Sequence, residues 1–429
     1  MQISYKNDNK IADKKLKDLV EEYVNNISRD KKNILIIPPD KTRKHSGAGK
    51  ITNLLFHKLK DNKNVKIMPA LGTHDPMTVE EKEDMFGENI SQEYFLVHRW
   101  REDTVKIGEV PAEFISEISN SVYKDEVVVN INQKIMNRNR FDLIISIGQV
   151  LPHEVVGMAN YTKNIVVGCG GEEIINKSHF LGAIYGIEKL LGKDHSPVRK
   201  LYDYIENKFL KDVPLNYIFT VNKSEINEEN ETADIVGFFA ANEDIRDIFE
   251  EAVELSQKVN ITYLEEPVEK FVVYLDPSEF TSTWLGNKAI YRTRMAVADN
   301  GEIIIIAPGL KQIGEDDRFD QLIKKYGYQD RDEILRLVKS EEELKNNLAV
   351  AAHLIHGSTE GRFTVKYASR SISPKIIEKV NYEFVPLERI ESKYPLEDLA
   401  RGYNKRQGEE FYFIENPATG LWVCENKFN

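Results

Sequence analysis

The segment PHEVVGMANYTKNIVVGCGGEEIINKSHF, residues 152–180, places two imidazoles and an amine at wide intervals in an apolar, glycine-rich run. His153 stands ten positions before Lys163, and His179 stands sixteen positions after it. A further histidine, His74, follows an apolar run in LGTHDP. Three of these histidines could ligate zinc. Alternatively, two of them could flank a substrate as paired acid–base groups, since an unperturbed pKa near 6.5 suits proton exchange near neutrality.

A second polar cluster, DKTRKHSGAG, follows the apolar run NILIIPP. If a strand ends there and a helix begins, free N–H groups and the helix dipole favour an anion. A guanidinium can clamp a carboxylate, and small residues allow close approach to a phosphate. The motif GxxxxGK[ST] of the P-loop is absent. The cluster is a candidate anion site whose polar and glycine members are Asp40, Thr42, Arg43, His45, Ser46, Gly47 and Gly49.

The later half of the chain holds two further candidates. Lys288 lies on a predicted helix, one turn after Trp284, and could bind the carboxylate of a substrate. His353 and His356 lie three positions apart and therefore on one helical face, where they could form a polyol-binding patch. An ordinary solvent-exposed face is the alternative for each.

Strand-length apolar runs alternate with helix-like segments in the first half, which predicts a mostly parallel, doubly wound α/β sheet of Rossmann type. The carboxyl ends of such strands are where ligands bind. The polar clusters above follow these ends. The predicted strands are 33–39, 65–72, 125–132, 141–148 and 163–168, and the predicted helices are 48–60, 111–121 and 178–192.

A second, smaller α/β domain is predicted from about residue 270, beginning with a βαβ unit. Its predicted strands are 270–277, 302–309 and 382–388, and its predicted helices are 282–299, 315–326, 329–338 and 340–355. The final residues predict a hairpin around Asn416-Pro417 and Thr419-Gly420, and the acidic stretch 222–234 predicts an exposed connection.

The length of 429 residues favours two domains. We expect an N-terminal cofactor-binding domain over 1–268, a C-terminal domain over 269–406, and a segment 407–429 that packs back on the first domain. The active site is expected in the cleft between the two domains.

Composition narrows the class of partner. The 58 basic and 70 acidic side chains give a net charge of −12, which argues against binding to nucleic acid or to an anionic membrane. Two cysteines and the lack of an apolar leader fit a cytoplasmic protein.

The motif DKTR after the first apolar run, the Gly-Thr-His of LGTH, and the spacing of His153, Lys163 and His179 resemble the lactate racemase family. These enzymes bind a nickel-pincer nucleotide, a pyridinium mononucleotide with two thiocarbonyl arms that hold Ni. The resemblance runs over nearly the whole chain. It implies a 2-hydroxy acid racemase or epimerase that acts through a 2-keto acid, and it implies maturation enzymes that supply the cofactor.

The resemblance also implies a role for each candidate. Lys163 would join the cofactor through a thioamide, and His179 would complete the square plane around Ni. His74 and His153 would be the two acid–base histidines. The remaining roles are substrate binding by Arg43, Lys288, Trp284, His353 and His356, and nucleotide contact by Asp40, Thr42, Ser46, Gly47 and Gly49.

Several substrate-facing positions depart from the family pattern. A proline after the DxTR motif is replaced by Lys44, a Ser-Gly-Gly before the lysine by Ala159-Asn160-Tyr161, and a Tyr-Gln pair by Trp284-Leu285. These changes favour a larger substrate than lactate, with extra polar groups for a polyol tail from His45, Asn160, Tyr161, His353 and His356. The predicted reaction is 2-epimerisation of gluconate and mannonate, with malate, 2-hydroxyglutarate or lactate racemisation as alternatives.

Two other functions use the same residues. A zinc hydrolase would hold its metal through three of the histidines, although no HExxH spacing supports it. A sugar-acid-binding protein without catalysis would keep the cleft and lack the cofactor.

Overall fold

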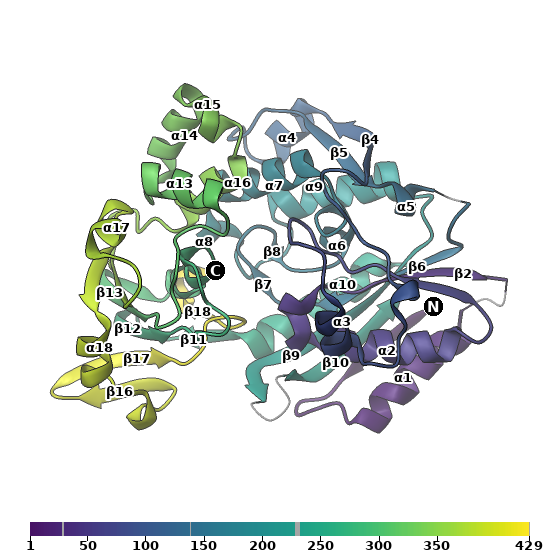
Figure 1. The fold of residues 1–429 in the computed structure, drawn as a ribbon, viewed down its shortest axis with the longest axis horizontal. Helices are drawn as coiled ribbons and strands as arrows, with labels where there is room; N and C mark the ends of the chain where they lie inside the picture. Colours follow the sequence, from purple (N-terminus) through teal and green to yellow (C-terminus); the bar gives the residue numbers. More distant parts are fainter. Residues whose placement is uncertain (28–29, 138, 228–231, 429) are drawn as a thin grey trace. The chain divides into compact units, whose positions relative to one another are not determined.

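The computed structural model describes residues 1–27, 30–137, 139–227 and 232–428, and the chain divides into two compact units (Figure 1). The first unit contains Met1–Ser178 and Leu191–Asn260, and the second contains His179–Leu190 and Ile261–Asn429. Each unit is built around a six-stranded sheet. The predicted class of two α/β units is confirmed.

The first sheet has the strand order β1-β10-β9-β6-β2-β3. Strands β9, β6, β2 and β3 run parallel, whereas β10 and β1 are antiparallel additions. The bounds of its strands are β1 (Gln2–Lys6), β2 (Asn33–Ile37), β3 (Asn64–Ile67), β6 (Leu143–Gln149), β9 (Leu215–Asn227) and β10 (Thr232–Ala241).

Helices cover both faces of this sheet. Leu16, Leu19, Val20 and Tyr23 of α1 follow helical spacing and pack with alternate residues of β2. The intervening Leu35 and Ile37 are also fully buried. The helices of this unit are α1 (Asp13–Asn25), η1 (Lys41–Ser46), α2 (Ala48–Leu59), α3 (Val79–Phe86), η2 (Gln92–Tyr94), α4 (Ala112–Ile118), α5 (Gln133–Met136), α6 (Thr162–Val166), α9 (Pro197–Ile205), η3 (Glu206–Leu210), α10 (Ile245–Asn260) and the first half of α7 (Glu172–Tyr185), whose second half belongs to the second unit.

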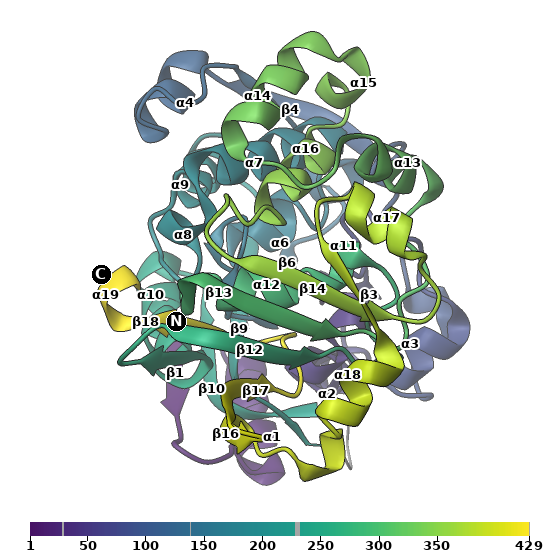
Figure 2. The same cartoon turned by 90° about the vertical axis from the view of Figure 1, so that its left-hand side faces the viewer.

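The second sheet has the order β15-β14-β13-β12-β17-β16, and only the last strand is antiparallel to its neighbour. Figure 2 shows β12, β13 and β14 side by side. The predicted βαβ unit is present, because β12 and β13 are parallel and α11 and α12 connect them. The strands are β12 (Val268–Tyr274), β13 (Val297–Ile306), β14 (Thr364–Ser369), β15 (Glu383–Pro386), β16 (Gly402–Arg406) and β17 (Glu409–Ile414), and β11 (Ile261–Leu264) pairs separately with β18 (Leu421–Cys424).

Among the described residues, four helices of the second unit lie in the sequence between β13 and β14, and the others come before or after these strands. The predicted helix 282–299 is two short helices followed by the start of β13, and the predicted helix 340–355 is likewise divided at Asn346-Asn347. Their bounds are α8 (Ile187–Leu190), α11 (Thr283–Gly286), α12 (Lys288–Thr293), α13 (Asp317–Tyr326), α14 (Arg331–Ser340), α15 (Glu342–Lys345), α16 (Leu348–His356), α17 (Pro374–Lys379), α18 (Leu387–Lys393), η4 (Leu396–Asp398) and α19 (Glu425–Phe428).

The predicted strand over 163–168 is wrong. These residues form α6 and the turn after it, and the Asn164 amide donates to Ile37 O at 3.2 Å and to Ser146 Oγ at 2.9 Å. The segment therefore lies against the ends of β2 and β6 and adds no strand. A short apolar run cannot by itself distinguish a buried helix from a buried strand.

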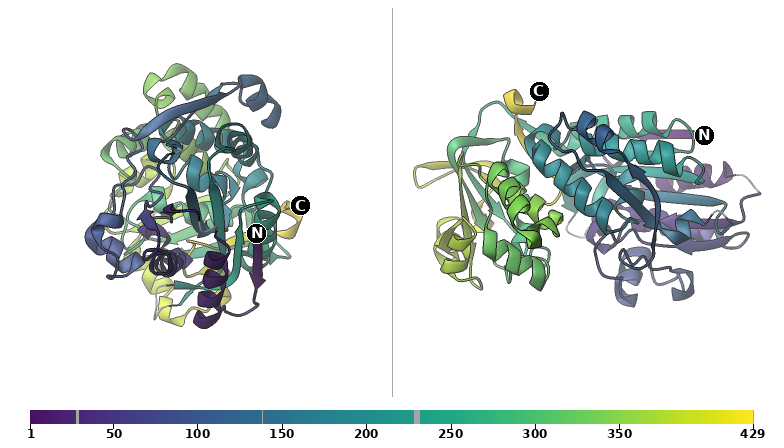
Figure 3. Two further views of the ribbon diagram at one scale, coloured as in Figure 1. Left: turned by 90° about the vertical axis from the view of Figure 1, so that its right-hand side faces the viewer. Right: turned by 90° about the horizontal axis from the view of Figure 1, so that it is seen from above.

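The predicted strand 125–132 exists as β5 (Val127–Asn132), but it pairs with β4 (Thr104–Val110) in a separate ribbon, blue in Figure 3. The predicted connection 222–234 is largely the hairpin of β9 and β10. Residues 228–231 of that stretch lie outside the described residues.

The predicted helix 178–192 begins earlier, at Glu172, and Gly186 separates α7 from α8 with a φ of 110°. The C-terminal hairpin is also a wrong prediction. β17 pairs with β12 and β16, whereas β18 pairs with β11, so the residues 409–424 belong to the second unit and not to the first. No helix among the described residues has the length and apolar character that crossing a bilayer requires.

Candidate active site

The first candidate loop begins where β2 ends. Asp40 caps η1: its carboxylate accepts hydrogen bonds from Thr42 N at 3.1 Å and from Thr42 Oγ1 at 2.5 Å. Short polar side chains are favoured at this position because they satisfy the free N–H groups of a helix start. Arg43 follows, and its guanidinium donates to Thr42 O at 3.1 Å.

The glycines of this loop have structural reasons of their own. A side chain at Gly49 would overlap the carbonyl oxygen of Met85, and one at Gly47 would meet Ile235. Ser46 is fully buried, and its hydroxyl accepts from Ala48 N at 3.2 Å. Close packing of α2 against α3 and β10 therefore accounts for these residues. Their contact with a nucleotide stays a prediction.

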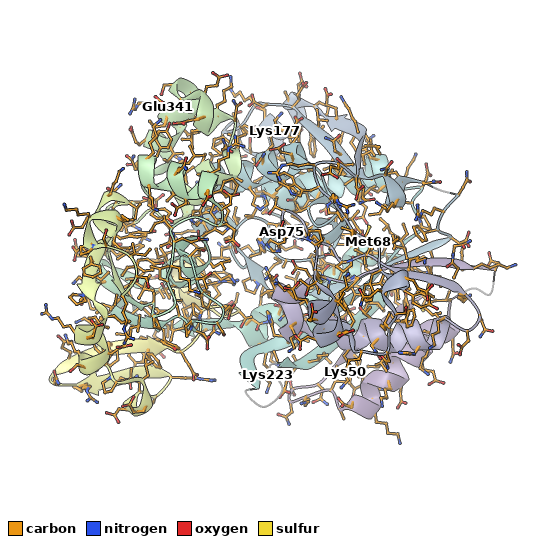
Figure 4. The ribbon with its side chains drawn as sticks, in the orientation of Figure 1. Lys50, Met68, Asp75, Lys177, Lys223 and Glu341 are labelled. Carbon is orange, nitrogen blue, oxygen red and sulfur yellow. The ribbon has the colours of Figure 1, made fainter. Side chains whose placement is uncertain are left out.

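His74 lies on the loop that follows β3, and its Nδ1 contacts the Asp40 carboxylate. In Figure 4 the labels Met68 and Asp75 mark two residues of this loop, and Asp75 is the residue after His74. The Asp40 side chain is 6% exposed and that of His74 is 47% exposed. Burial opposes ionisation of Asp40, but hydrogen bonds from His74 and Thr42 outweigh it and hold the pKa of the carboxyl below its ordinary value.

An ionised Asp40 can only accept, so Nδ1 of His74 must carry the proton. In the neutral form of the ring, Nε2 then carries the lone pair, which is the arrangement of a general base oriented by a carboxylate. The loop is also tied to the Lys163 segment, because Gly72 N donates to Gly168 O at 2.9 Å.

His153 lies just beyond β6, in a small hairpin of β7 (Pro152–His153) and β8 (Gly157–Met158). Its side chain is 12% exposed. The Val155 N–H donates to Nδ1 at 3.1 Å, so a neutral His153 carries its proton on Nε2. In the neutral state, Nε2 of His153 is therefore a hydrogen-bond donor, whereas Nε2 of His74 is an acceptor.

Lys163 is the second residue of α6 and is partly buried. Burial, reinforced by the charges of Arg43 and Arg199, lowers the pKa of its amine to about 8, while Glu154 and Asp40 act in the opposite direction. About a tenth of the amine is thus neutral and nucleophilic at pH 7, far more than for an ordinary lysine with a pKa near 10.4. Strands β3, β2 and β6 are neighbours and parallel, and their carboxyl ends carry His74, Asp40 and His153.

His179 lies in the middle of α7 and not near a helix start as predicted. It belongs to the second unit together with α8. Its role as a nickel ligand stays a prediction.

The predicted substrate residues of the second unit lie in and around an aromatic cluster. The His353 ring stacks on Trp284 with centroids 4.1 Å apart, and its nitrogens face the hydroxyls of Tyr291 at 2.8 Å and Tyr328 at 3.1 Å. His353 and His356 are both buried, contrary to a surface patch.

Lys288 begins α12, and its side chain is largely buried. Its amine lies 3.9 Å from a Glu279 oxygen and 5.5 Å from the Phe280 ring centroid. Carboxylate binding by Lys288 stays a prediction.

The three-histidine zinc site finds no support in the geometry. Across the described ranges, one group of possible ligands comes close together: Asp194, His195 and Glu250. The guanidinium of Arg246 lies against all three of them. The positive charge of the Arg246 side chain therefore already occupies this cluster.

Sequence reasoning missed two residues that organise the site, Asn164 and Arg199. Arg199 is 0% exposed and bonds the segment that leads into Lys163. The sequence does contain a sign of its burial. Arg199 lies next to the apolar positions that form the buried face of an amphipathic helix, which are Val198, Leu201, Tyr202 and Ile205.

Part of the chain is similar in sequence to known proteins. Residues 3–189 match the lactate racemase N-terminal domain. The chain is 31% identical over 177 residues to the lactate racemase of Thermoanaerobacterium thermosaccharolyticum, and 29% identical over 178 residues to that of Lactiplantibacillus plantarum. Each match covers 40% of this chain and only 36% of the relative.

Two solved structures share the fold over nearly the whole chain. A crystal structure of a Thermotoga maritima protein matches with a TM-score of 0.83 and 23% identity, covering 98% of this chain and 100% of that one. The lactate racemase apoprotein of T. thermosaccharolyticum matches with a TM-score of 0.70 and 19% identity, covering 96% and 93%. The N-terminal part of the chain is thus similar to lactate racemases, and the chain spans only about a third of the length of these curated relatives.

Proposed function

We propose that the protein is an isomerase that inverts C2 of a 2-hydroxy acid. The observation that carries this proposal is the pair of histidines with opposite Nε2 roles at the ends of the parallel strands β3 and β6, which lie on either side of β2. Inversion of a carbinol carbon needs a group that takes the hydroxyl proton and a group that returns one. The Asp40–His74 contact and the Val155–His153 bond supply these two groups in the neutral state.

The site residues fit the nickel-pincer nucleotide of the family. Lys163 offers a partly neutral amine for thioamide attachment beside the strand ends where open α/β sheets bind ligands. His179 would offer a nitrogen donor to the nickel. When bound, this cofactor supplies a reversible hydride acceptor for C2, which makes a planar 2-keto acid accessible.

The chain's own residues would bind and orient the substrate. Arg43 is partly buried beside Asp40 and can hold a carboxylate through two N–H groups, and Lys288 would add a second positive charge. His74 Nε2 would take the hydroxyl proton while His153 Nε2–H faces the opposite side. The roles exchange in the reverse direction, so both enantiomers or epimers are substrates.

Within this class we propose D-gluconate and D-mannonate as the substrate pair. Support comes from Trp284-Leu285, which departs from the family pattern, and from the partly buried His45, which is an extra polar group near Arg43 in the sequence. Asn160 and Tyr161 no longer support a polyol tail, because both are buried. The same holds for His353 and His356.

A panel of C2-deuterated 2-hydroxy acids tests the proposal. The protein is produced together with the cofactor maturation enzymes and incubated with gluconate, lactate, malate or 2-hydroxyglutarate. We expect epimerisation that keeps the deuterium, fastest with gluconate. Loss of label to solvent would point to enolisation, and inversion of none of the acids would refute the proposed class.

Intact mass provides the matched control. The loaded protein should carry a covalent adduct and about one nickel per chain, and Lys163→Ala should lose the adduct. The exposed Lys50→Ala should retain both.

A further inference from the structure

The residues before Lys163 adopt backbone angles that side chains disfavour. Asn160 has a φ of 71°, and Tyr161 has a φ of 58° with a ψ of −136°. The second combination is close to a glycine-only region. The chain therefore makes a glycine-like turn at these two positions without glycine. Such a conformation persists only when its surroundings hold it.

Arg199 of α9 supplies that hold. Its guanidinium donates to Met158 O at 2.8 Å, to Asn160 O at 3.1 Å and to Thr162 Oγ1 at 2.9 Å. One planar donor thus fixes three alternate residues of the segment that ends at Lys163. The rigid fork of an arginine matches such a set of acceptors, whereas a lysine ammonium cannot reach them in one plane.

The rest of the Arg199 side chain is enclosed. The side chain is 0% exposed, and the guanidinium carbon lies 4.7 Å from the Phe249 ring centroid. Asp194 Oδ1 lies 3.9 Å from Nε. Tyr161 packs on the same side, with its ring 5.1 Å from that of Phe249. The guanidinium and the strained turn therefore form one packed assembly.

We propose that Arg199 is a positioning residue for Lys163: it maintains the strained turn Met158–Thr162 and thereby fixes the amine at the ends of β2 and β6. This deepens the proposed function, because the fixed amine is the one that would carry the cofactor. The charged groups that act on this amine are Arg43, Arg199, Glu154 and Asp40. Loss of the turn would expose the Lys163 amine to solvent and raise its pKa toward that of an ordinary lysine.

The test measures the amine directly in the full chain without cofactor. Acetylation by N-hydroxysuccinimide acetate is followed at Lys163 by peptide mass spectrometry between pH 6 and 10. The wild-type midpoint is expected at about 8. Arg199→Lys and Arg199→Gln should both raise it by at least one pH unit, which slows acetylation near pH 7 about tenfold. A midpoint that stays near the wild-type value in both variants would overturn the proposal.

A rescue separates positioning from general destabilisation. Asn160→Gly added to Arg199→Lys should return the midpoint toward that of the wild type, because glycine adopts the turn without help. The matched control is Asn120→Gly in the same background, an exposed residue with a φ of 56°. Equal rescue by both glycines would refute the assignment.

If the Arg199 variants fail to fold, Thr162→Val removes one acceptor with little change of shape. It should raise the midpoint in the same direction by a smaller amount, and an unchanged midpoint would again count against Arg199. None of these readouts needs nickel or turnover. Failure of the proposed function would therefore leave them intact, and the two proposals can fail separately.

Discussion

Asp40 links two parts of the candidate site through one carboxylate. It caps η1 with one oxygen and orients His74 with the other. Asp40 thereby holds both the loop that carries Arg43 and the tautomer that His74 needs as a base. Asparagine can keep the capping oxygen but loses the charge, which is why the replacement of Asp40 by asparagine should affect rate more than binding.

Asp40→Asn should lower kcat by about 10²-fold or more with a much smaller change in KM, because the neutral amide no longer fixes the proton on Nδ1 of His74. Steady-state kinetics of the cofactor-loaded enzyme measure the two parameters separately. The control is Asp84→Asn, which removes an exposed ion pair with Lys44 and should leave both parameters within twofold. An unchanged kcat in Asp40→Asn would remove Asp40 from the acid–base machinery.

At the scale of elements, the turn before Lys163 rests on a buried polar layer between α9, η3 and β9. Glu206 of η3 accepts a hydrogen bond from the Tyr217 hydroxyl at 3.0 Å. Burial raises the pKa of Glu206 to about 7, and hydrogen bonds from Tyr161 and Tyr217 only partly offset it. The folded protein therefore holds a proton here that the unfolded chain releases.

This difference gives a pH dependence with a definite sign. The contribution of Glu206 to the free energy of unfolding is complete below the ordinary glutamate pKa near 4.3 and is lost as pH rises through about 7. The reason is that, between these pH values, the folded state binds a proton that the unfolded state has released. The wild-type free energy of unfolding should fall by on the order of 3 kcal/mol between about pH 4.5 and 7 from this group alone.

Urea denaturation at a series of pH values measures this loss. Glu206→Gln should remove most of it, whereas the exposed Glu113→Gln should keep the wild-type slope. Parallel slopes in wild type and Glu206→Gln would contradict a protonated Glu206.

At the scale of the whole molecule, residues 179–190 belong to the second unit although they lie within the first half of the sequence. Glu188 of α8 explains part of this membership. It accepts from Arg294 Nε at 3.0 Å and from Arg362 at 2.6 Å, and the Arg294 side chain is only 1% exposed. The segment that carries His179 is thereby fastened to β13 and its neighbours.

Glu188→Gln should weaken this attachment by about 1.5–3 kcal/mol, because hydrogen bonds to a charged partner are among the stronger ones. Amide hydrogen exchange of residues 179–190 should accelerate accordingly. Exchange in β2 and β6 should stay unchanged. Glu102→Gln, on an exposed turn, is the matched control, and equal protection of 179–190 in both variants would show that Glu188 contributes nothing.

Three features could be predicted from the amino-acid sequence alone. They are the α/β class, the strand ends at which His74 and His153 lie, and the residue spacing that resembles lactate racemases. These features are local: apolar runs, polar caps and residue intervals are present before the chain folds. The prediction of two units was right for the same reason, because alternation of strands and helices starts again near residue 268.

The conformation of segment 158–168 depends on tertiary contacts and could not be predicted from its own residues. Asn164 finds acceptors on β2 and β6, and Arg199 finds acceptors at Met158, Asn160 and Thr162. These partners are distant in sequence, so no local pattern reveals that an apolar run is a helix and not a strand. The same long-range packing buries Asn160 and Tyr161, two residues that the sequence suggested as substrate contacts.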